Sequence, residues 1–268
     1  MARISQAVAQ VNVSGAASRV RIYFPLDLGT TASANNVDAK FGPQPQSGVS
    51  TTGSGGSSTT PVYGGASCIE YLASLVNDVQ NVKASRKTSW LTERSGGTLT
   101  DEYSCFSLRA TLAWDVLPAN AASDIGLFIV CGNLNNNIIS GPNAGVVFGP
   151  TSAATVGLRA YKAALTVNEV VAAGSTPDLT KWNTFEIRCI SGSPSADPVL
   201  FGLINGQVVT AEYSWTAAAA LLPPPNIYAQ TGYFMGVGIA NSAAQANVIH
   251  QYIREVCWTW AGSESALT

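Results

Sequence analysis

The sequence offers few residues for nucleophilic or acid–base catalysis, and His250 is the only histidine among 268 residues. A Ser-His-Asp triad would have to use this residue. His250 lies in an alternating apolar and polar run, on the same side as Tyr252 and Arg254. A histidine in such a setting more often makes a structural hydrogen bond than it carries out catalysis. We therefore predict a structural role for His250.

The acidic residues are not spaced for paired carboxylate chemistry. Asp101 and Glu102 are adjacent, so on a strand their side chains would point to opposite faces. Glu186 and Glu212 each stand alone on a predicted strand. The motif "GNLNNN" at 132–137 provides amide oxygens but no carboxylate, so it indicates a hairpin turn and not a calcium site. With no phosphate-binding loop, dinucleotide motif or nucleophile elbow in the sequence, we predict no catalytic residues, no metal, no cofactor and no enzyme activity.

The five cysteines have no spacing typical of a zinc site or a disulfide framework. Cys68 opens a run with helical periodicity, and the other four lie in strand-like runs: Cys105, Cys131, Cys189 and Cys257. The pattern favours buried free thiols, which behave as small apolar side chains.

Exposed aromatic side chains are the usual feature of a sugar-binding surface. Trp215, Tyr228 and Tyr233 border the segment "LLPPPNIYAQTGY" and could form such a platform for a glycan. In the alternative, Trp215 covers the core and the prolines of this segment dock on a neighbouring subunit. The sequence leaves both interpretations open.

The composition argues against some partners. Charged residues make up 11% of the chain, against about 25% in an ordinary soluble domain. A net charge of −2 gives no electrostatic reason to bind nucleic acid. No apolar stretch approaches the ~20 residues of a membrane span, and the first 15 residues lack the apolar core of a signal peptide. We expect synthesis in a cytoplasm and a surface that is covered by neighbouring subunits, or else a monomer kept soluble by Ser, Thr and Asn.

The stretch with the clearest pattern is residues 181–209. Phe185, Ile187 and Cys189 alternate with polar residues, which predicts a strand with one buried face. After a loop rich in Ser and Pro, a second apolar run ends in Asn205-Gly206, the preferred pair of a type I′ turn. The pattern predicts a three-stranded antiparallel meander.

Elsewhere the sequence predicts mostly strands. Residues 1–66 are expected to hold an N-terminal strand and an extended arm or loop rich in Gly, Ser and Thr over 31–66. Apolar residues recur at intervals of three and four over 68–85, which favours one short helix, although a strand over part of it stays open. Long β-rich runs follow from Leu99 onward, and together they predict an all-β, two-sheet antiparallel sandwich.

The order of these motifs resembles the concanavalin A-like lectin/glucanase jelly roll, including its laminin-G-like relatives. The resemblance covers about residues 98–262, within a jelly-roll domain assigned to 67–268 and with 18–28 as a candidate first strand. The matching residues are Trp182, Phe185, Ile187, Arg188, Asn205, Gly206, Val209, Gly238, Asn241, Tyr252, Ile253, Arg254 and Val256. The "E-x-D-x-x-E" strand of the glucanases is absent from the sequence, and its acidic residues are too scattered for a lectin metal loop.

The combination of a jelly roll, an N-terminal arm and low charge is similar to virion structural proteins of tailed bacteriophages. This resemblance implies a non-enzymatic capsid cement, decoration or fibre protein, located in the virion and assembled as a homo-oligomer, with a trimer favoured. The implied partners are the major capsid protein or other virion proteins, without nucleic acid or membrane. The alternative is a carbohydrate-binding module that recognises a host receptor.

Overall fold

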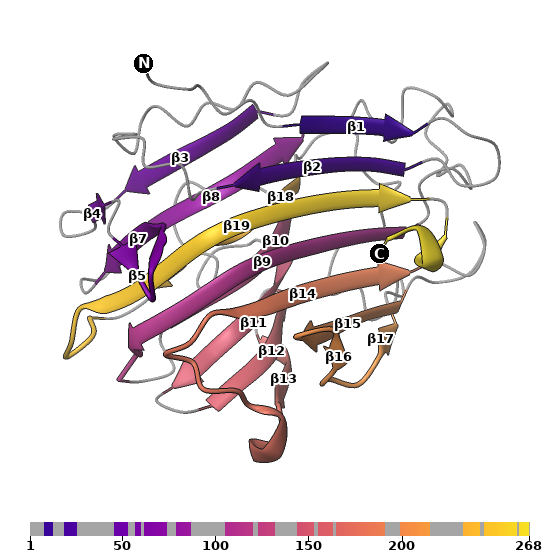
Figure 1. Ribbon diagram of the computed structural model, residues 1–268. Helices are drawn as coiled ribbons and strands as arrows, with labels where there is room; N and C mark the ends of the chain where they lie inside the picture. Colours follow the sequence, from indigo (N-terminus) through magenta and orange to yellow (C-terminus); the bar gives the residue numbers. More distant parts are fainter. Residues whose placement is uncertain are drawn as a thin grey trace, which may run out of the picture.

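The computed structural model consists almost entirely of antiparallel strands in two layers (Figure 1). It describes residues 8–12, 19–25, 46–52, 57–59, 62–73, 79–86, 105–119, 123–131, 144–152, 155–162, 165–190, 199–214, 233–241, 244–261 and 263–267. The predicted all-β, two-sheet antiparallel sandwich is confirmed. No helix in these ranges is long and apolar enough to cross a membrane.

The first layer, sheet A, has ten strands and lies in front in Figure 1. Its main path runs through β1 (Val8–Asn12), β2 (Arg19–Pro25), β19 (Ile249–Ala261), β9 (Cys105–Val116), β14 (Asn183–Ile190), β15 (Val199–Ile204) and β16 (Gln207–Val208). Three short strands branch from this path: β17 (Tyr213–Ser214) pairs with β15, β7 (Ile69–Ala73) with β19, and β4 (Ser57–Thr59) with β7.

The second layer, sheet B, has seven strands. In spatial order these are β13 (Leu165–Val170), β12 (Thr155–Lys162), β11 (Ala144–Ser152), β10 (Ser123–Cys131), β18 (Tyr233–Asn241), β8 (Val79–Arg86) and β3 (Gln46–Thr52). A separate ribbon pairs β5 (Val62–Tyr63) with β6 (Ala66–Ser67), and two 3-10 turns span Ala173–Ser175 and Glu264–Ala266.

The core lies between the two sheets because alternate residues of each strand face inward. On β14, Phe185 and Ile187 are fully buried in this core, whereas Glu186 and Arg188 face the opposite side. Aromatic rings hold the centre: the ring of Phe185 lies 5.2 Å from that of Trp114 and 5.6 Å from that of Phe148, both edge-on. Such pairs add about 0.5–1.5 kcal/mol each beyond the buried area.

One buried side chain, Gln251 of β19, connects the two sheets by hydrogen bonds. Its Oε1 accepts a 3.0 Å bond from Trp114 Nε1 within sheet A and a 3.0 Å bond from the backbone N–H of Gly126 in sheet B. Gly126 has a φ of 105°, in the positive region that favours glycine. A backbone N–H of sheet B thus donates to a side chain of sheet A.

Four glycines lie in line across sheet B. Gly238 of β18 is paired with Gly126 of β10, and Gly149 of β11 with Gly157 of β12. A Cβ built at Gly149 would lie 2.1 Å from the carbonyl oxygen of Ile125, and one at Gly126 would lie 2.9 Å from the Cα of Gly149. Strands β10 and β11 therefore approach each other so closely that neither position has room for a side chain.

The predicted meander and its turn are confirmed. Strand β14 pairs with β15, and β15 pairs with β16 through Ile204 and Gln207. Asn205 and Gly206 have φ values of 51° and 81°, as a type I′ turn requires. The Asn205 side chain also accepts a 2.9 Å bond from the Thr184 N–H and donates a 3.0 Å bond to the side chain of Asn183.

Replacing Asn205-Gly206 by Val-Ala should lower the free energy of unfolding by about 1–3 kcal/mol, because both new side chains are strained at positive φ. Urea unfolding measures this loss. Asn205→Gly is the matched control, since it keeps the turn geometry and removes only the two side-chain bonds, so its loss should be smaller. An unchanged urea midpoint for the Val-Ala variant would contradict the role of this turn.

The short helix predicted over 68–85 was wrong: the described part of this segment forms β7 and β8. Burial alternates along β7, because Tyr71 is fully buried whereas Glu70 and Leu72 are only partly buried. The apolar spacing fits either periodicity at these positions. Pairing of β7 with β19, and of β8 with β18, overrides the helical pattern.

The N-terminal 66 residues contribute strands to both layers. Strand β2, within the candidate first strand at 18–28, pairs with β19, and β3 pairs with β8. The expected arm over 31–66 therefore contains β3 and β4, which pair with β8 and β7 in the two sheets. Of the other residues in this range, the structure describes only those of the β5–β6 ribbon. The division into 1–66 and 67–268 stays a prediction.

Candidate functional site

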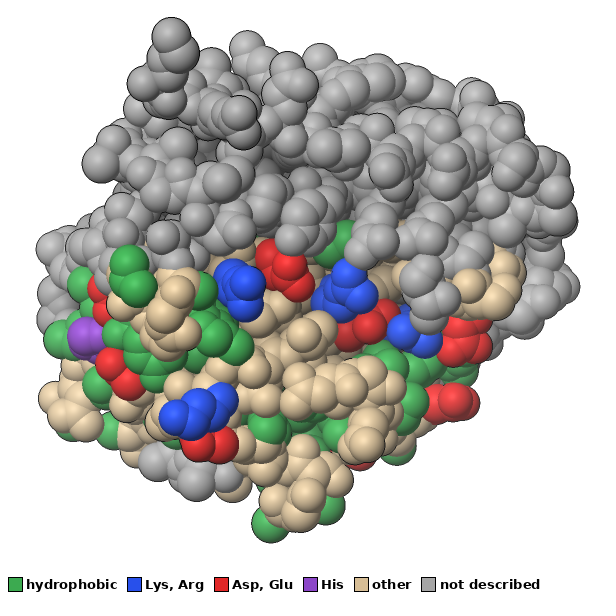
Figure 2. Space-filling model, in the orientation of Figure 1, with side chains coloured by type: hydrophobic (Ala, Val, Ile, Leu, Met, Phe, Trp, Pro, Cys, Tyr) green, Lys and Arg blue, Asp and Glu red, His purple; other side chains and the backbone are tan. Residues whose placement is uncertain are grey.

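The outer side of sheet A carries a group of polar side chains from three adjacent strands. We call it the polar face, and it consists of Ser107, Arg109 and Thr111 on β9, Glu186 and Arg188 on β14, and Glu255, Cys257 and Thr259 on β19. Strand pairing aligns these residues in rows: Arg109 lies between Cys257 and Glu186. Figure 2 shows basic and acidic side chains alternating across this side of the molecule.

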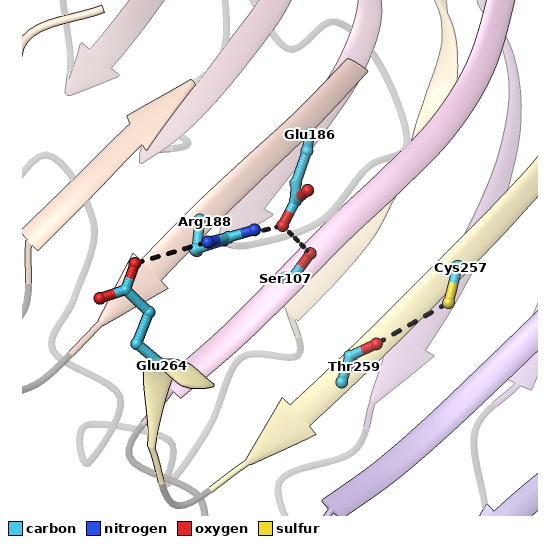
Figure 3. Close-up of polar contacts among 6 residues, drawn as sticks. All are labelled: Ser107, Glu186, Arg188, Cys257, Thr259 and Glu264. Atoms are coloured by element: carbon cyan, nitrogen blue, oxygen red, sulfur yellow. Dashed lines mark hydrogen bonds and ion pairs between the residues drawn. The ribbon is translucent and has the colours of Figure 1, made fainter. Parts of the chain in front are cut away.

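Glu186 is the centre of a connected network on the polar face (Figure 3). Its Oε1 accepts a 2.7 Å bond from Ser107 Oγ and a 2.9 Å bond from Arg188 Nε. The Nη1 of Arg188 lies 3.4 Å from Glu264 Oε1, on the C-terminal 3-10 turn. Glu186 is only 7% exposed, so the paired arginine and the hydroxyl replace the water that its carboxylate loses. This carboxylate joins β14 to β9 and to the C-terminal turn.

A second group lies at one end of the same face, around His250. The Nδ1 of His250 is 2.9 Å from Glu70 Oε1 and 3.7 Å from Asp115 Oδ1. In Figure 2 the single histidine, in purple, lies between acidic side chains at the left edge. The predicted hydrogen bond of His250 is thereby confirmed, whereas its structural role stays a prediction.

Tyr252 also belongs to this group. Its hydroxyl donates a 2.9 Å bond to Asp115 Oδ2. Burial raises the pKa of Tyr252 well above its usual range, and hydrogen bonds to Asp115 and Glu70 add to the effect. A phenol held in its protonated form serves as a hydrogen-bond donor and not as a base. Arg254, which the sequence placed on the same side, lies at a register shift of β19 and is exposed.

Three aromatic rings cover the Tyr252 end of the polar face. The ring of Tyr63 stacks on that of Tyr252 with centroids 3.9 Å apart, and Trp182 meets Tyr63 edge-on at 5.7 Å. The Tyr63 hydroxyl donates to the Thr180 carbonyl at 2.8 Å, and Trp182 Nε1 donates to the Tyr63 carbonyl at 3.3 Å. Sequence reasoning missed this cluster, because Tyr63 and Trp182 are 119 residues apart and the motif that contains Trp182 indicated a strand and not its aromatic partner.

The glycan platform predicted from sequence stays a prediction. Trp215 and Tyr228 lie outside the described residues. Tyr233 begins β18, but its side chain is not described. Residues 132–137 of the predicted amide-rich turn are likewise outside the described ranges, between the paired strands β10 and β11.

The described side chains of sheet B include a buried ion pair. Arg159 Nη1 of β12 lies 3.2 Å from Asp124 Oδ1 of β10, and the two residues are 3% and 2% exposed. The Arg159 Nη2 also lies 3.5 Å from the Pro150 carbonyl of the intervening strand. The pair thus spans three strands. Among the described residues, no group of three or more His, Cys, Asp or Glu side chains is arranged to hold a metal ion.

The thiols whose side chains are described are all buried. Cys68, Cys105 and Cys189 are each 1% exposed and Cys257 is 3% exposed, and none of the four is in a disulfide, as predicted. Burial raises the pKa of Cys68 to about 11, and burial likewise raises that of Cys189 well above its usual range. The reactive thiolates of Cys68 and Cys189 are therefore scarce at neutral pH.

Native protein should accordingly resist alkylation at these four thiols. We expect iodoacetamide at neutral pH to modify at most one of the five cysteines in the folded state, and all five in concentrated urea without prior reductant. Intact-mass spectrometry counts the adducts, and peptide mapping identifies them. Rapid labelling of Cys68 in folded protein would contradict the burial described above.

No protein-family model matches this chain, and a search of curated proteins finds no significant relative. Solved structures do resemble it. A protein of unknown function, SO2946 from Shewanella oneidensis MR-1, matches with a TM-score of 0.52 at 11% identity, over 96% of this chain and 92% of that one. Peanut lectin, solved with a nine-residue peptide, matches with a TM-score of 0.50 at 14% identity, over 90% of this chain and 97% of the lectin.

A conserved carbohydrate esterase from Shiga toxin-encoding bacteriophage phi24B has a TM-score of 0.49 at 12% identity, over 80% of this chain and 90% of the esterase. At such identities, similarity to solved structures establishes the fold alone. The chain has the concanavalin A-like jelly-roll fold, as the sequence motifs predicted.

Proposed function

We propose that this concanavalin A-like jelly-roll protein is a non-enzymatic structural protein of a tailed-bacteriophage virion, where it acts as a capsid cement or decoration protein. The proposal rests on what the side chains that could act as acids, bases or nucleophiles contact in the structure. In the described part of the chain, these side chains bind neighbouring strands to one another, and they do not converge on a substrate site.

The carboxylates illustrate this use. Glu186 joins β14 to β9, and Glu255 of β19 accepts a 2.8 Å bond from Thr111 of β9. Glu70 joins β7 to β19 through His250, and Asp124 joins β10 to β12 through Arg159. A general acid or base needs access to a reacting group, whereas these carboxylates are engaged by protein partners. They suit a protein whose task is to hold its shape.

Glu169 of β13 connects sheet B to sheet A in the same way. It accepts bonds from the Tyr213 hydroxyl and from the Ala211 N–H, and Tyr213 lies on β17, which pairs with β15 of sheet A. Burial, together with this hydrogen bond, raises the pKa of Tyr213 to about 12, so the tyrosine remains a donor at physiological pH. Ties between the sheets would resist shear when the protein is part of a particle.

The proposed partners are the major capsid protein and further copies of this chain, with a trimer as the favoured oligomer. The composition supports this assignment, because a chain with 11% charged residues leaves a largely neutral surface that loses little hydration when it is covered. The proposed location is the virion.

Particle composition tests the proposal. We expect mass spectrometry of purified phage particles, from a host whose genome encodes this chain, to find it at a copy number comparable to that of the major capsid protein. Single-particle images of the same sample should place it on the capsid. Absence from purified particles would contradict the proposal, and turnover of a polysaccharide or an ester by the isolated chain would contradict its non-enzymatic part.

A second candidate function is carbohydrate binding, favoured by the cluster of Tyr63 and Trp182. Both rings are partly exposed, and the side chain of Asp115, which lies beside Tyr252, is 41% exposed. Aromatic rings next to a carboxylate form a surface on which a sugar ring can stack and bind through its hydroxyls. We expect any glycan that binds this end of the polar face to lose at least tenfold in affinity with Trp182→Ala, and far less with Trp182→Phe.

Glycan-array screening followed by calorimetry measures this effect. Trp182→Phe keeps an aromatic ring, so it separates stacking from general loss of structure. If an identified glycan binds both variants as tightly as the original protein, its site lies elsewhere, and the platform of Trp215, Tyr228 and Tyr233 becomes the next to test.

A further inference from the structure

Two polar side chains lie inside the core, on neighbouring strands of sheet A. Tyr71 of β7 and Gln251 of β19 are directly paired, so their side chains leave the sheet on the same side. Both residues are 0% exposed. Ile249 and Ile253, two residues before and two residues after Gln251, belong to the apolar core.

The hydrogen-bonding capacity of this pair is only partly used. Gln251 Oε1 accepts two bonds, from Trp114 and from Gly126, and this fixes which end of the amide is the oxygen. Its Nε2, and the hydroxyl of Tyr71, have no hydrogen-bond partner among the residues that the structure describes. Leaving one buried donor unsatisfied is costly, and proteins rarely leave two on paired residues of neighbouring strands.

We propose that Tyr71 and Gln251 form a binding site for one internal water molecule between the two sheets. The Nε2 of Gln251 donates to the water oxygen, and the Tyr71 hydroxyl forms a second hydrogen bond with the same water. A buried water of this kind serves polar groups that the chain cannot pair directly.

The chemistry of the two groups favours water over other small ligands. A cation would face the donor Nε2 with no carboxylate beside it, and an anion would lose its hydration with no positive charge to replace it. Burial raises the pKa of Tyr71 well above its usual range, so the phenol stays neutral and supplies no charge. Water is neutral and both donates and accepts, as this pair requires.

Magnetic relaxation dispersion of water oxygen-17 counts long-lived internal waters in solution and tests the site on the full chain. We expect Tyr71→Phe to remove one such water relative to the original protein. Tyr252→Phe is the matched control, because its hydroxyl is bound by Asp115, and we expect it to leave the count unchanged. Equal counts for the original protein and Tyr71→Phe would overturn the proposal.

A second measurement requires no variant, in case Tyr71→Phe folds poorly. A crystal structure at a resolution that reveals ordered solvent should show one water within hydrogen-bond distance of both Tyr71 Oη and Gln251 Nε2. A direct bond between the two side chains, or continuous protein atoms between them, would overturn the proposal.

Discussion

Gln251→Leu is expected to lower the free energy of unfolding by about 2–5 kcal/mol, although leucine is apolar and similar in size. The substitution removes the acceptor of two buried donors, Trp114 Nε1 and the Gly126 N–H. Each donor left without a partner costs about 1–3 kcal/mol. The substitution also removes the buried Nε2 of Gln251, which has no hydrogen-bond partner among the described residues, and this offsets part of the loss.

Urea unfolding of a double-mutant cycle measures the effect and assigns it. Trp114→Phe removes one of the two donors, so the loss caused by Gln251→Leu should be smaller in that background than in the original protein. The exposed Gln207 provides the control, and Gln207→Leu should change stability by less than about 0.5 kcal/mol. If Gln251→Leu left the urea midpoint unchanged, the connection between the sheets through this side chain would be wrong.

Gly126→Ala is expected to cost about 2–5 kcal/mol through two separable causes. At a φ of 105° a side chain is strained, which accounts for about 1–2 kcal/mol. The new Cβ would also lie 2.4 Å from the Phe148 carbonyl oxygen, and forcing a group into a packed interior costs about 1–3 kcal/mol. Because the contact is with the backbone of a paired strand, it cannot be relieved by turning a side chain.

Two other glycines separate these causes. Gly65 has a φ of 78° with no atom within 4 Å of its added Cβ, so Gly65→Ala should show the backbone strain alone, about 1–2 kcal/mol. Gly174 lies in an exposed turn with neither strain nor contact, and Gly174→Ala should be neutral or slightly stabilising. Thermal and urea unfolding of the three variants should give this order. Equal stability of Gly65→Ala and Gly126→Ala would show that the strands are less close than described.

The sequence predicted what depends on local pattern. Alternation over 182–190 predicted the inward side of β14, and Asn205-Gly206 predicted the turn and its positive φ values, because each signal lies within a few residues. The short helix failed for the opposite reason. Apolar spacing over 68–85 fits two periodicities, and only the partners β19 and β18, far along the chain, decide between them.

The polar groups that stabilise the sandwich lie beyond such local signals. Nothing near Gln251 in the sequence indicates that it accepts a bond from Gly126, 125 residues away. The 25 glycines look alike in the sequence, and only the approach of β10 to β11 sets Gly126 and Gly149 apart. Glu186 was expected to stand alone, yet it is bound to Arg188 and to Ser107, on a strand 79 residues earlier.

The place of β19 has a consequence for how the chain reaches its folded state. Strand β19 comes after all its partners in the sequence, yet it lies between β2 and β9 in the middle of sheet A, and it also holds β7. During translation, β2, β7 and β9 emerge first and must wait with exposed edges until residues 249–261 arrive. Pairings between such distant segments form slowly. A polypeptide released before residue 249 therefore lacks the strand that joins β2 to β9. We expect proteases to degrade such a polypeptide before it can fold.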